Sequence, residues 1–242
     1  MGGQIVGGLL GWALDTFCEA EFQPARLTVD LLRPVMLKPV QIETIVKRQG
    51  RRLRLVDGAL LQTGRVVARA SALFLRRSEH PDGEVWSSPV AMPPIPTYPN
   101  ELEIDKPFDI WTYGVNSDSG SVGIAAGEWE QATAQKFAWV RLIRPMVAGH
   151  PLTPFTRAAF AGDIVSSLTH WGTAGLRYIN ADYTISLSRL PEGEYIGLAA
   201  QSHYGNKGVA AGAATVLDHR GPVGTGAALA LAQSADAFQP TP

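Results

Sequence analysis

The segment Arg26-Leu-Thr-Val-Asp-Leu-Leu-Arg33 decides the fold, because its pattern returns as Asp182-Tyr-Thr-Ile-Ser-Leu-Ser-Arg189. Apolar and polar residues alternate in both segments, and this period of two predicts strands with one apolar face. Arg33 and Arg189 lie 156 residues apart, and the turn glycines Gly64 and Gly221 lie 157 apart. The nearly constant offset indicates an internal duplication.

Each copy is expected to contain one helix followed by four strands. The helical runs are Gly3–Phe17 and Phe155–His170, and Thr153 and Pro154 suit the start of the second. The strand-like runs are 26–33, 40–48, 51–62 and 65–75 in the first copy, and 182–189, 195–204, 208–217 and 223–231 in the second. Glycine and asparagine between the runs favour hairpins, and Gln49-Gly50 is an example. The order predicts an α+β fold with two long helices, each wrapped by an antiparallel sheet.

The stretch between the two copies has a different composition. Residues 81–107 contain seven prolines, which favours an extended linker, and residues 114–127 are small and polar. The apolar run Phe137–Ile143 is expected to open the second unit with a strand that the first unit lacks. The division predicted is therefore an N-terminal unit over 1–78, a linker over 79–136 and a C-terminal unit over 137–242.

The composition indicates a globular, soluble and cytoplasmic protein. The 242 residues are 45% hydrophobic and 18% charged, and the net charge of −1 disfavours a nucleic-acid partner. The single cysteine, Cys18, cannot form a disulfide within the chain and is expected to pack as a small hydrophobe. The apolar segment 5–14 is much shorter than the ~20 residues that a membrane span requires. No metal or cofactor motif is present.

The first helix is unusually rich in glycine. Glycine weakens a helix by about 1 kcal/mol relative to alanine, so a ligand or a backbone is expected to approach closely there. Tight packing against a curved sheet explains the glycines equally well. Under the first reading, the amides near Gly3 and Gln4 could bind the substrate by polarising a carbonyl oxygen, as helix N-termini can.

Several short motifs together resemble the TesB-like (type II) acyl-CoA thioesterases, which have a double hotdog fold. In the first half these are Gly2-Gly3-Gln4-Ile5-Val6-Gly7, Leu31-Leu32-Arg33-Pro34, Gly50-Arg51-Arg52 and Ala68-Arg69-Ala70 with Phe74. In the second half they are Ala159-Phe160-Ala161-Gly162-Asp163, Asn180-Ala181-Asp182-Tyr183-Thr184 with Arg189, and Leu217-Asp218 with Gly221-Pro222-Val223-Gly224. The resemblance covers residues 2–77 and about 137–231. It implies a helix wrapped by an antiparallel sheet, twice, and an acyl-CoA substrate.

The resemblance also implies a mechanism. An aspartate, a hydroxyl-bearing residue and a glutamine hold a water that attacks the thioester directly. The family aspartate falls on Asp182, and the hydroxyl-bearing residue falls on Gln201 or Ser202. The family glutamine falls near Ala228 or Leu229, neither of which can hold water, so Gln201 is expected to supply the amide.

Other polar residues have weaker claims to a catalytic role. Asp163 is expected to be structural, with a place in the site as the alternative, and Asp30 is expected to be structural or interfacial. His203 could protonate the leaving thiolate, although a partly exposed histidine without that role is the simpler reading. The basic cluster Arg51, Arg52 and Arg54 could meet coenzyme A phosphates or could be a solvated hairpin.

The leading hypothesis is therefore an acyl-CoA thioesterase with Asp182 as base and Gln201 or Ser202 orienting water, assembled as a homodimer or higher oligomer. The alternative is a degenerate double hotdog that binds acyl chains or partners without turnover, because the last-strand glutamine is missing. A hotdog dehydratase is a third reading, since it needs a histidine–carboxylate pair, which only His203 near Asp182 could form.

Overall fold

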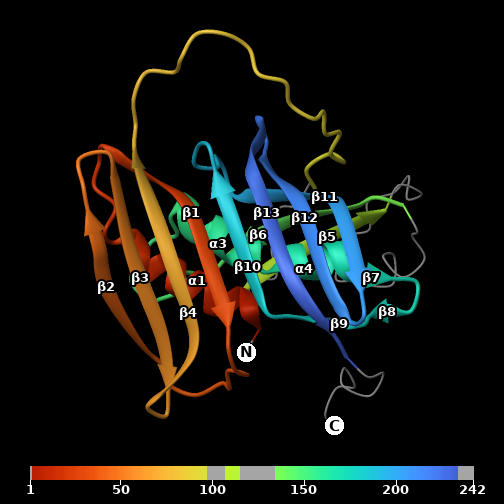
Figure 1. The fold of residues 1–242 in the computed structure, drawn as a ribbon, viewed down its shortest axis with the longest axis horizontal. Coiled ribbons are helices and arrows are strands. Elements are labelled where there is room, and N and C mark those ends of the chain that lie inside the picture. Colours follow the sequence, from red (N-terminus) through yellow and green to blue (C-terminus); the bar gives the residue numbers. More distant parts are fainter. Residues whose placement is uncertain (1, 97–106, 115–133, 234–242) are drawn as a thin grey trace.

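The structure, a computed structural model, describes residues 2–96, 107–114 and 134–233. One eleven-stranded sheet runs through both halves of the chain, and the helices lie together on one of its faces, behind the strands in Figure 1. Hydrogen-bonded neighbours follow the order β2-β3-β4-β1-β10-β13-β12-β11-β6-β5, and β9 pairs with β13. All the pairings are antiparallel.

The N-terminal half has the expected helix and four strands. They are α1 (Gly3–Asp15), β1 (Phe22–Leu31), β2 (Gln41–Gln49), β3 (Leu53–Gln62) and β4 (Arg65–Arg76). Period-two burial on β1 places Leu27 and Val29 in the core, whereas Thr28 and Asp30 point to the opposite face.

The C-terminal half contains more elements than expected. They are β5 (Phe108–Gly114), β6 (Lys136–Leu142), α3 (Pro154–Gly162), α4 (Ile164–His170), β7 (Trp171–Gly172), β8 (Gly175–Leu176), β9 (Tyr178–Asn180), β10 (Asp182–Leu187), β11 (Tyr195–Asn206), β12 (Val209–Asp218) and β13 (Gly221–Ala232). The opening strand expected near residue 137 is β6. The linker expected over 79–136 contains β5, which pairs with β6, so part of it belongs to the sheet. Most of the predicted polar loop 114–127 lies outside the described residues.

The two halves join along β1 and β10, the strands that define the repeat. Thr28 pairs with Thr184, 156 residues away, and their hydroxyl oxygens lie 2.9 Å apart. The equivalent residues of the two copies therefore meet at the centre of the sheet. This is the arrangement expected when two duplicated sheets pair edge to edge.

The prediction of two long helices is wrong for the second copy. Only α1, with 13 residues, is continuous, because the second helix is interrupted at Asp163 into α3 and α4, with 9 and 7 residues. Gly162 precedes the interruption, and the Ser166 amide bonds to the carbonyl of Asp163, three residues earlier. Glycine and a shortened hydrogen bond are ordinary features of a kink.

The core lies between the sheet and the helices. The helices run antiparallel, because Asp163 lies beside the start of α1 and Thr153 beside its end. A β-carbon at Gly11 would overlap that of Ala159, so glycine allows α1 and α3 to touch. Close helix packing therefore accounts for some of the glycines. No helix in the described ranges is long and apolar enough to cross a membrane.

Candidate active site

Asp163 is a buried acidic group that faces a helix N-terminus. It lies at the interruption between α3 and α4, is 7% exposed, and points at the first turn of α1. A β-carbon at Gly3 would overlap the carboxylate oxygens, so glycine at this position allows the approach. The sequence motif that ends in Asp163 therefore meets the motif that begins the chain.

Two donors hold the Asp163 carboxylate. The side-chain amide of Asn180, at the end of β9, donates to Oδ1, and the backbone N–H of Gln4 donates as well. Gln4 belongs to the first turn of α1, whose amides have no partners within the helix. The carboxylate thus serves as the cap that the Gly2 N-cap, which has no side chain, cannot provide.

The pKa of Asp163 is raised from its usual value to about 6. Burial is the largest cause, because it penalises the charged form, and the bonds from Asn180 and Gln4 lower the pKa in part. A carboxylate with a pKa near 6 is ionised at neutral pH and can still accept a proton readily. It has the properties of a general base.

The predicted base, Asp182, lies on the other face of the sheet. Its neighbour Tyr183 points into the core, so Asp182 points outward, opposite Asp30 of β1. Asp182 lies where the chain passes from β9 to β10. Its Oδ1 accepts a 2.8 Å hydrogen bond from the backbone amide of Leu229 on β13. Burial raises the pKa of Asp182, and the bond from Leu229 lowers it. The side chain thus caps a backbone amide of β13, and Gly3 and Gln4 lie on the other face of the sheet.

Gln201 and Ser202 do not meet Asp182 either. They lie on β11, and two strands, β12 and β13, separate β11 from β10. Three strand spacings correspond to about 14 Å. Gln201 lies at a register shift and donates to the hydroxyl of Thr215 at 3.0 Å. The structure therefore brings together Gly3, Gln4 and Asp163, but not the three predicted catalytic residues.

His203 belongs to a separate aromatic cluster. Its Nδ1 lies 2.8 Å from Nδ1 of His170, at the end of α4, and both rings contact Tyr178. The histidine–carboxylate pair that a dehydratase needs is not formed with Asp182, because His203 faces the helices and Asp182 does not.

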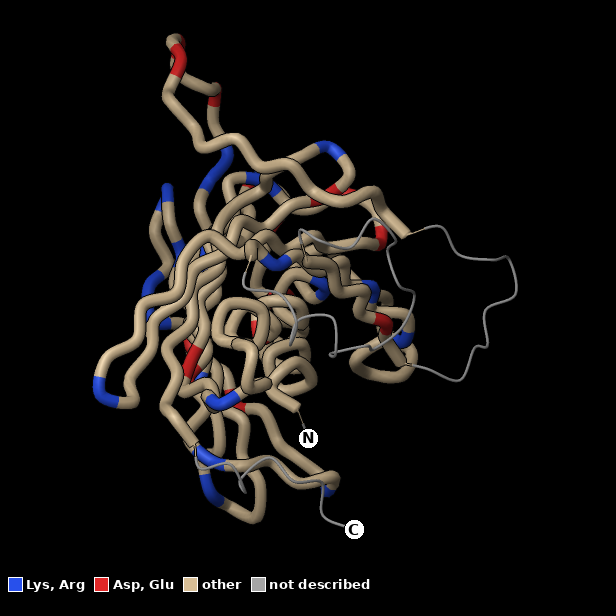
Figure 2. The backbone as a smooth tube through the Cα atoms, turned by 90° about the vertical axis from the view of Figure 1, so that its right-hand side faces the viewer, with Lys and Arg blue, Asp and Glu red and all other residues tan. Residues whose placement is uncertain are grey.

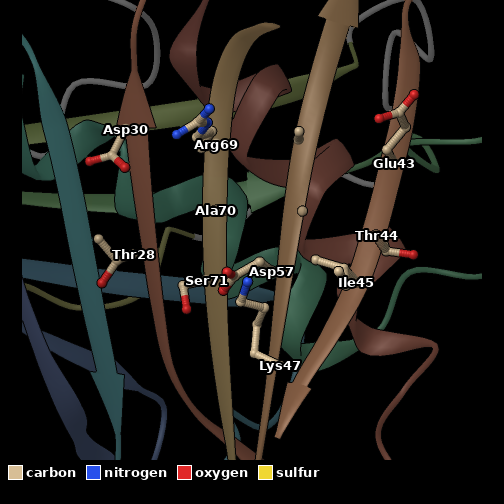
Figure 3. A pocket seen from close by; sticks show the side chains of 12 residues that line it. Thr28, Asp30, Glu43, Thr44, Ile45, Lys47, Asp57, Arg69, Ala70 and Ser71 are labelled. Carbon is tan, nitrogen blue, oxygen red and sulfur yellow. The ribbon is translucent and has the colours of Figure 1, made fainter.

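A hollow of about 630 Å³ lies over the N-terminal strands, on the face opposite the helices. Figure 3 shows that charges of both signs line it, including Asp30, Asp57, Lys47 and Arg69. Figure 2 likewise shows Lys and Arg interspersed with Asp and Glu along the backbone. The hollow lies on the opposite face of the sheet from Asp163, so the two do not form one site.

Two further groups named in the sequence analysis are Cys18 and the basic cluster. Burial, with the charge of Asp15 second, raises the pKa of the Cys18 thiol to about 11, so it is protonated at neutral pH and is a poor nucleophile. Arg54 forms an ion pair with Glu19, and Arg51 and Arg52 are exposed at a turn. Within the described residues, no group of three His, Cys, Asp or Glu side chains could hold a metal ion.

Comparisons with known proteins agree with this architecture. The profile of the acyl-CoA thioesterase N-terminal domain matches residues 1–75, and that of the C-terminal domain matches residues 89–232. The chain therefore belongs to the acyl-CoA thioesterase family, in its TesB-like, double-hotdog form. A sequence comparison with curated proteins finds no match.

Three solved structures show the same fold. A protein from Thermobifida fusca that is described as a thioesterase II has 20% identity and a TM-score of 0.70, over 97% of this chain and 87% of that one. The acyl-CoA thioesterase II TesB2 of Mycobacterium marinum has 17% identity and a TM-score of 0.67, over 98% and 91%. A protein with a hot dog fold from Alicyclobacillus acidocaldarius has 19% identity and a TM-score of 0.68, over 96% and 87%.

Asn180 is the residue beside Asp163 that the sequence analysis did not single out. It belongs to the motif Asn180–Thr184, but only Asp182 was singled out there. The available signal was the spacing between Asn180 and Tyr183. Strict alternation would point Asn180 away from the helices, and a register shift between the two residues lets it face them. In the structure the shift falls at Ala181 and Asp182, since Asn180 pairs with Ala230 and Thr184 with Ala227.

Proposed function

We propose that this protein hydrolyses acyl-CoA to a carboxylic acid and coenzyme A, with Asp163 as the general base. The observation that carries the proposal is the buried Asp163 carboxylate, with a pKa of about 6, held against the first turn of α1. Family membership supplies the substrate class, and the geometry supplies the residue. Substrate chain length is left open.

The mechanism proposed is direct attack by water. Asp163 takes a proton from a water molecule while the water oxygen bonds to the thioester carbon. Asn180, already hydrogen-bonded to the carboxylate, helps to orient that water. The carbonyl oxygen gains negative charge and is stabilised at the N-terminus of α1, where the amide of Gly3 has no partner within the helix. The C–S bond then breaks, and the proton on Asp163 passes to the departing thiolate.

The assignment of Asp182, Gln201 and Ser202 remains the alternative site. It would require substrate to bind on the outer face of the sheet, where these side chains are spread over about 14 Å. We favour Asp163 because base, orienting amide and helix N-terminus meet there.

A second candidate function is acyl-CoA binding without turnover. The last strand provides no amide side chain near the site, because Ala228 faces the core and Leu229 faces outward. Asn180 could replace that amide for water orientation. If it does not, the site would bind acyl-CoA and leave it intact.

The assembly and compartment are also proposals. We propose that the chain forms at least a dimer, as suggested by the uncharged outward positions of β12 and β13, and that it acts in the cytoplasm, where its single cysteine stays reduced.

The test is a pair of matched substitutions, Asp163→Asn and Asp182→Asn. Each keeps the size of the side chain and removes the carboxylate. We expect Asp163→Asn to lower the rate of coenzyme A release by about a hundred- to ten-thousandfold, and Asp182→Asn to leave it nearly unchanged. Release is measured directly across acyl lengths, with melting temperatures as folding controls.

The reverse pattern would restore Asp182 as the base. A wild-type protein that binds acyl-CoA of every length without releasing coenzyme A would favour the binding function.

A further inference from the structure

Tyr183 lies directly beneath the interruption in the second helix. The side chain is fully buried on β10, and its hydroxyl donates a 2.7 Å hydrogen bond to the carbonyl of Ala159, one turn before Asp163. A side chain that bonds to a helix carbonyl is one established cause of a kink. The phenol is thus attached to α3 at the point where the helix changes course.

The ring also fills the space between the two helices. A β-carbon at Gly162 would lie 2.5 Å from a ring carbon of Tyr183, and one at Gly7 of α1 would overlap the hydroxyl. Glycine is therefore required on both helices for this ring to fit. The Tyr183 side chain therefore contacts both α1 and α3, including Gly162, the residue just before Asp163.

We propose that Tyr183 is a positioning residue, which holds the helix interruption in the shape that presses the Asp163 carboxylate against the start of α1. This inference rests on the proposed function of Asp163. Without the hydroxyl bond, the interruption can relax, and the carboxylate can move away from the amides of Gln4 and Asn180. The burial that raises the pKa of Tyr183 well above its usual value also keeps the hydroxyl protonated, so it stays a donor.

Packing alone is the competing explanation for Tyr183. Under that explanation the ring matters and the hydroxyl does not. Tyr183→Phe separates the two, because it keeps the ring between Gly7 and Gly162 and removes only the bond to Ala159.

The experiment follows the carboxyl signal of Asp163 by NMR during a pH titration, together with kcat and KM. The Asp163 signal is identified by its absence in Asp163→Asn. In Tyr183→Phe we expect the pKa of Asp163 to rise above its wild-type value, because the bonds from Asn180 and Gln4 that lower it are weakened. We expect kcat to fall by about ten- to a hundredfold with little change in KM, and the acid limb of the rate profile to move to higher pH.

One control variant completes the design. Tyr195→Phe makes the same change in the separate cluster around Trp111, and should leave the Asp163 titration as it is.

An Asp163 titration that is identical in wild type and Tyr183→Phe overturns the inference, even if Asp163 is the base. Full hydrolysis by Asp163→Asn overturns the proposed function instead, while the NMR titration still reports whether Tyr183 positions the carboxylate.

Discussion

Two buried titratable side chains at opposite ends of α4 have pKa values shifted in opposite directions. Burial raises the pKa of Asp163 to about 6, and burial, followed by the charge of His203, lowers the pKa of His170 to about 4. Both shifts disfavour the charged form, as burial in an apolar core must. Asp163 and His170 are therefore both neutral between about pH 4 and about pH 6.

These shifts affect stability with opposite sign. The folded-state pKa of His170 lies below its unfolded value of 6.5, so the unfolded chain takes up a proton first and stability is lost as pH falls from about 6.5 to about 4. Asp163 has a raised pKa, and its contribution is lost as pH rises from 3.8 through about 6. In wild-type protein the two trends partly cancel.

Replacing His170 should therefore reveal how much its protonation contributes to the pH dependence of stability. We expect wild-type protein to lose stability relative to His170→Asn between pH 6.5 and pH 4, with a slope of at most about 1.4 kcal/mol per pH unit. Urea unfolding at several pH values measures the difference. His219→Asn, at an exposed turn, is the matched control. A difference that does not change with pH would mean that His170 is protonated as easily in the folded chain as in the unfolded one.

At the scale of elements, the contact between α1 and α3 depends on small residues. Gly7 and Gly162 accept the ring of Tyr183, and Gly11 accepts the β-carbon of Ala159. These positions explain why a helix so rich in glycine is stable here, since helix packing outweighs the weak intrinsic propensity. Gly3 likewise allows a side chain of the same protein, Asp163, to approach the start of α1.

Gly7→Ala tests this contact. The new β-carbon would lie 3.0 Å from the Ala159 carbonyl oxygen and would overlap the Tyr183 hydroxyl, so we expect a loss of about 1–3 kcal/mol in the free energy of unfolding. The loss should be smaller in a Tyr183→Phe background, where the overlapping oxygen is absent. A double-mutant cycle by urea unfolding measures this coupling.

Gly172→Ala provides the control, because a β-carbon there meets nothing within 4 Å. We expect it to change stability by no more than about 0.5 kcal/mol. Equal losses for Gly7→Ala in both backgrounds would show that the tyrosine hydroxyl does not occupy the space in question.

The strands were predictable from sequence because period-two alternation and turn glycines are local signals. Arg189 and Asp218, which belong to two of the family-like motifs, are joined by two hydrogen bonds between their side chains. The interruption at Asp163 was not predictable, because apolar periodicity continues through it. It depends on a tyrosine from another element and on the start of α1, both distant in sequence.

Asn180, which belongs to the site we propose, was missed for a related reason. A register shift between β9 and β10 turns Asn180 inward and leaves Asp182 facing outward, and alternation alone cannot reveal a one-residue shift. The motif predicted the strand, but the strand pairing decides which face of the sheet each of its residues occupies.

At the scale of the whole molecule, the two halves of the sheet differ on the face opposite the helices. The N-terminal half carries charges of both signs around the hollow of Figure 3. On the C-terminal half, the outward positions of β12 and β13 carry no charge: they are Val209, Ala211, Ala213, Thr215, Thr225, Ala227, Leu229 and Leu231. An exposed strand face without charge is typical of a surface that another layer or chain covers.

A second copy of the chain is the cover we propose. Leu229 and Leu231 are about half exposed, at 49% and 50%, and Ile179 pairs beside Leu231. A symmetric dimer places the same patch against itself, and an uncharged patch meets no like-charge repulsion in that arrangement. Asp163 lies on the opposite side of the sheet, so assembly and chemistry can be tested separately.

Lysines at the centre of this patch should therefore break the dimer. We expect wild-type protein to have a mass of at least twice 26.0 kDa by light scattering at micromolar concentration, and Leu229→Lys with Leu231→Lys to approach 26.0 kDa. Two buried charges of one sign facing their copies cost far more than an apolar contact. Ile45→Lys makes the same change at an exposed position on the charged half, and should leave the mass unchanged. A monomeric wild type, or a double variant that keeps its dimer, would place the interface elsewhere or remove it.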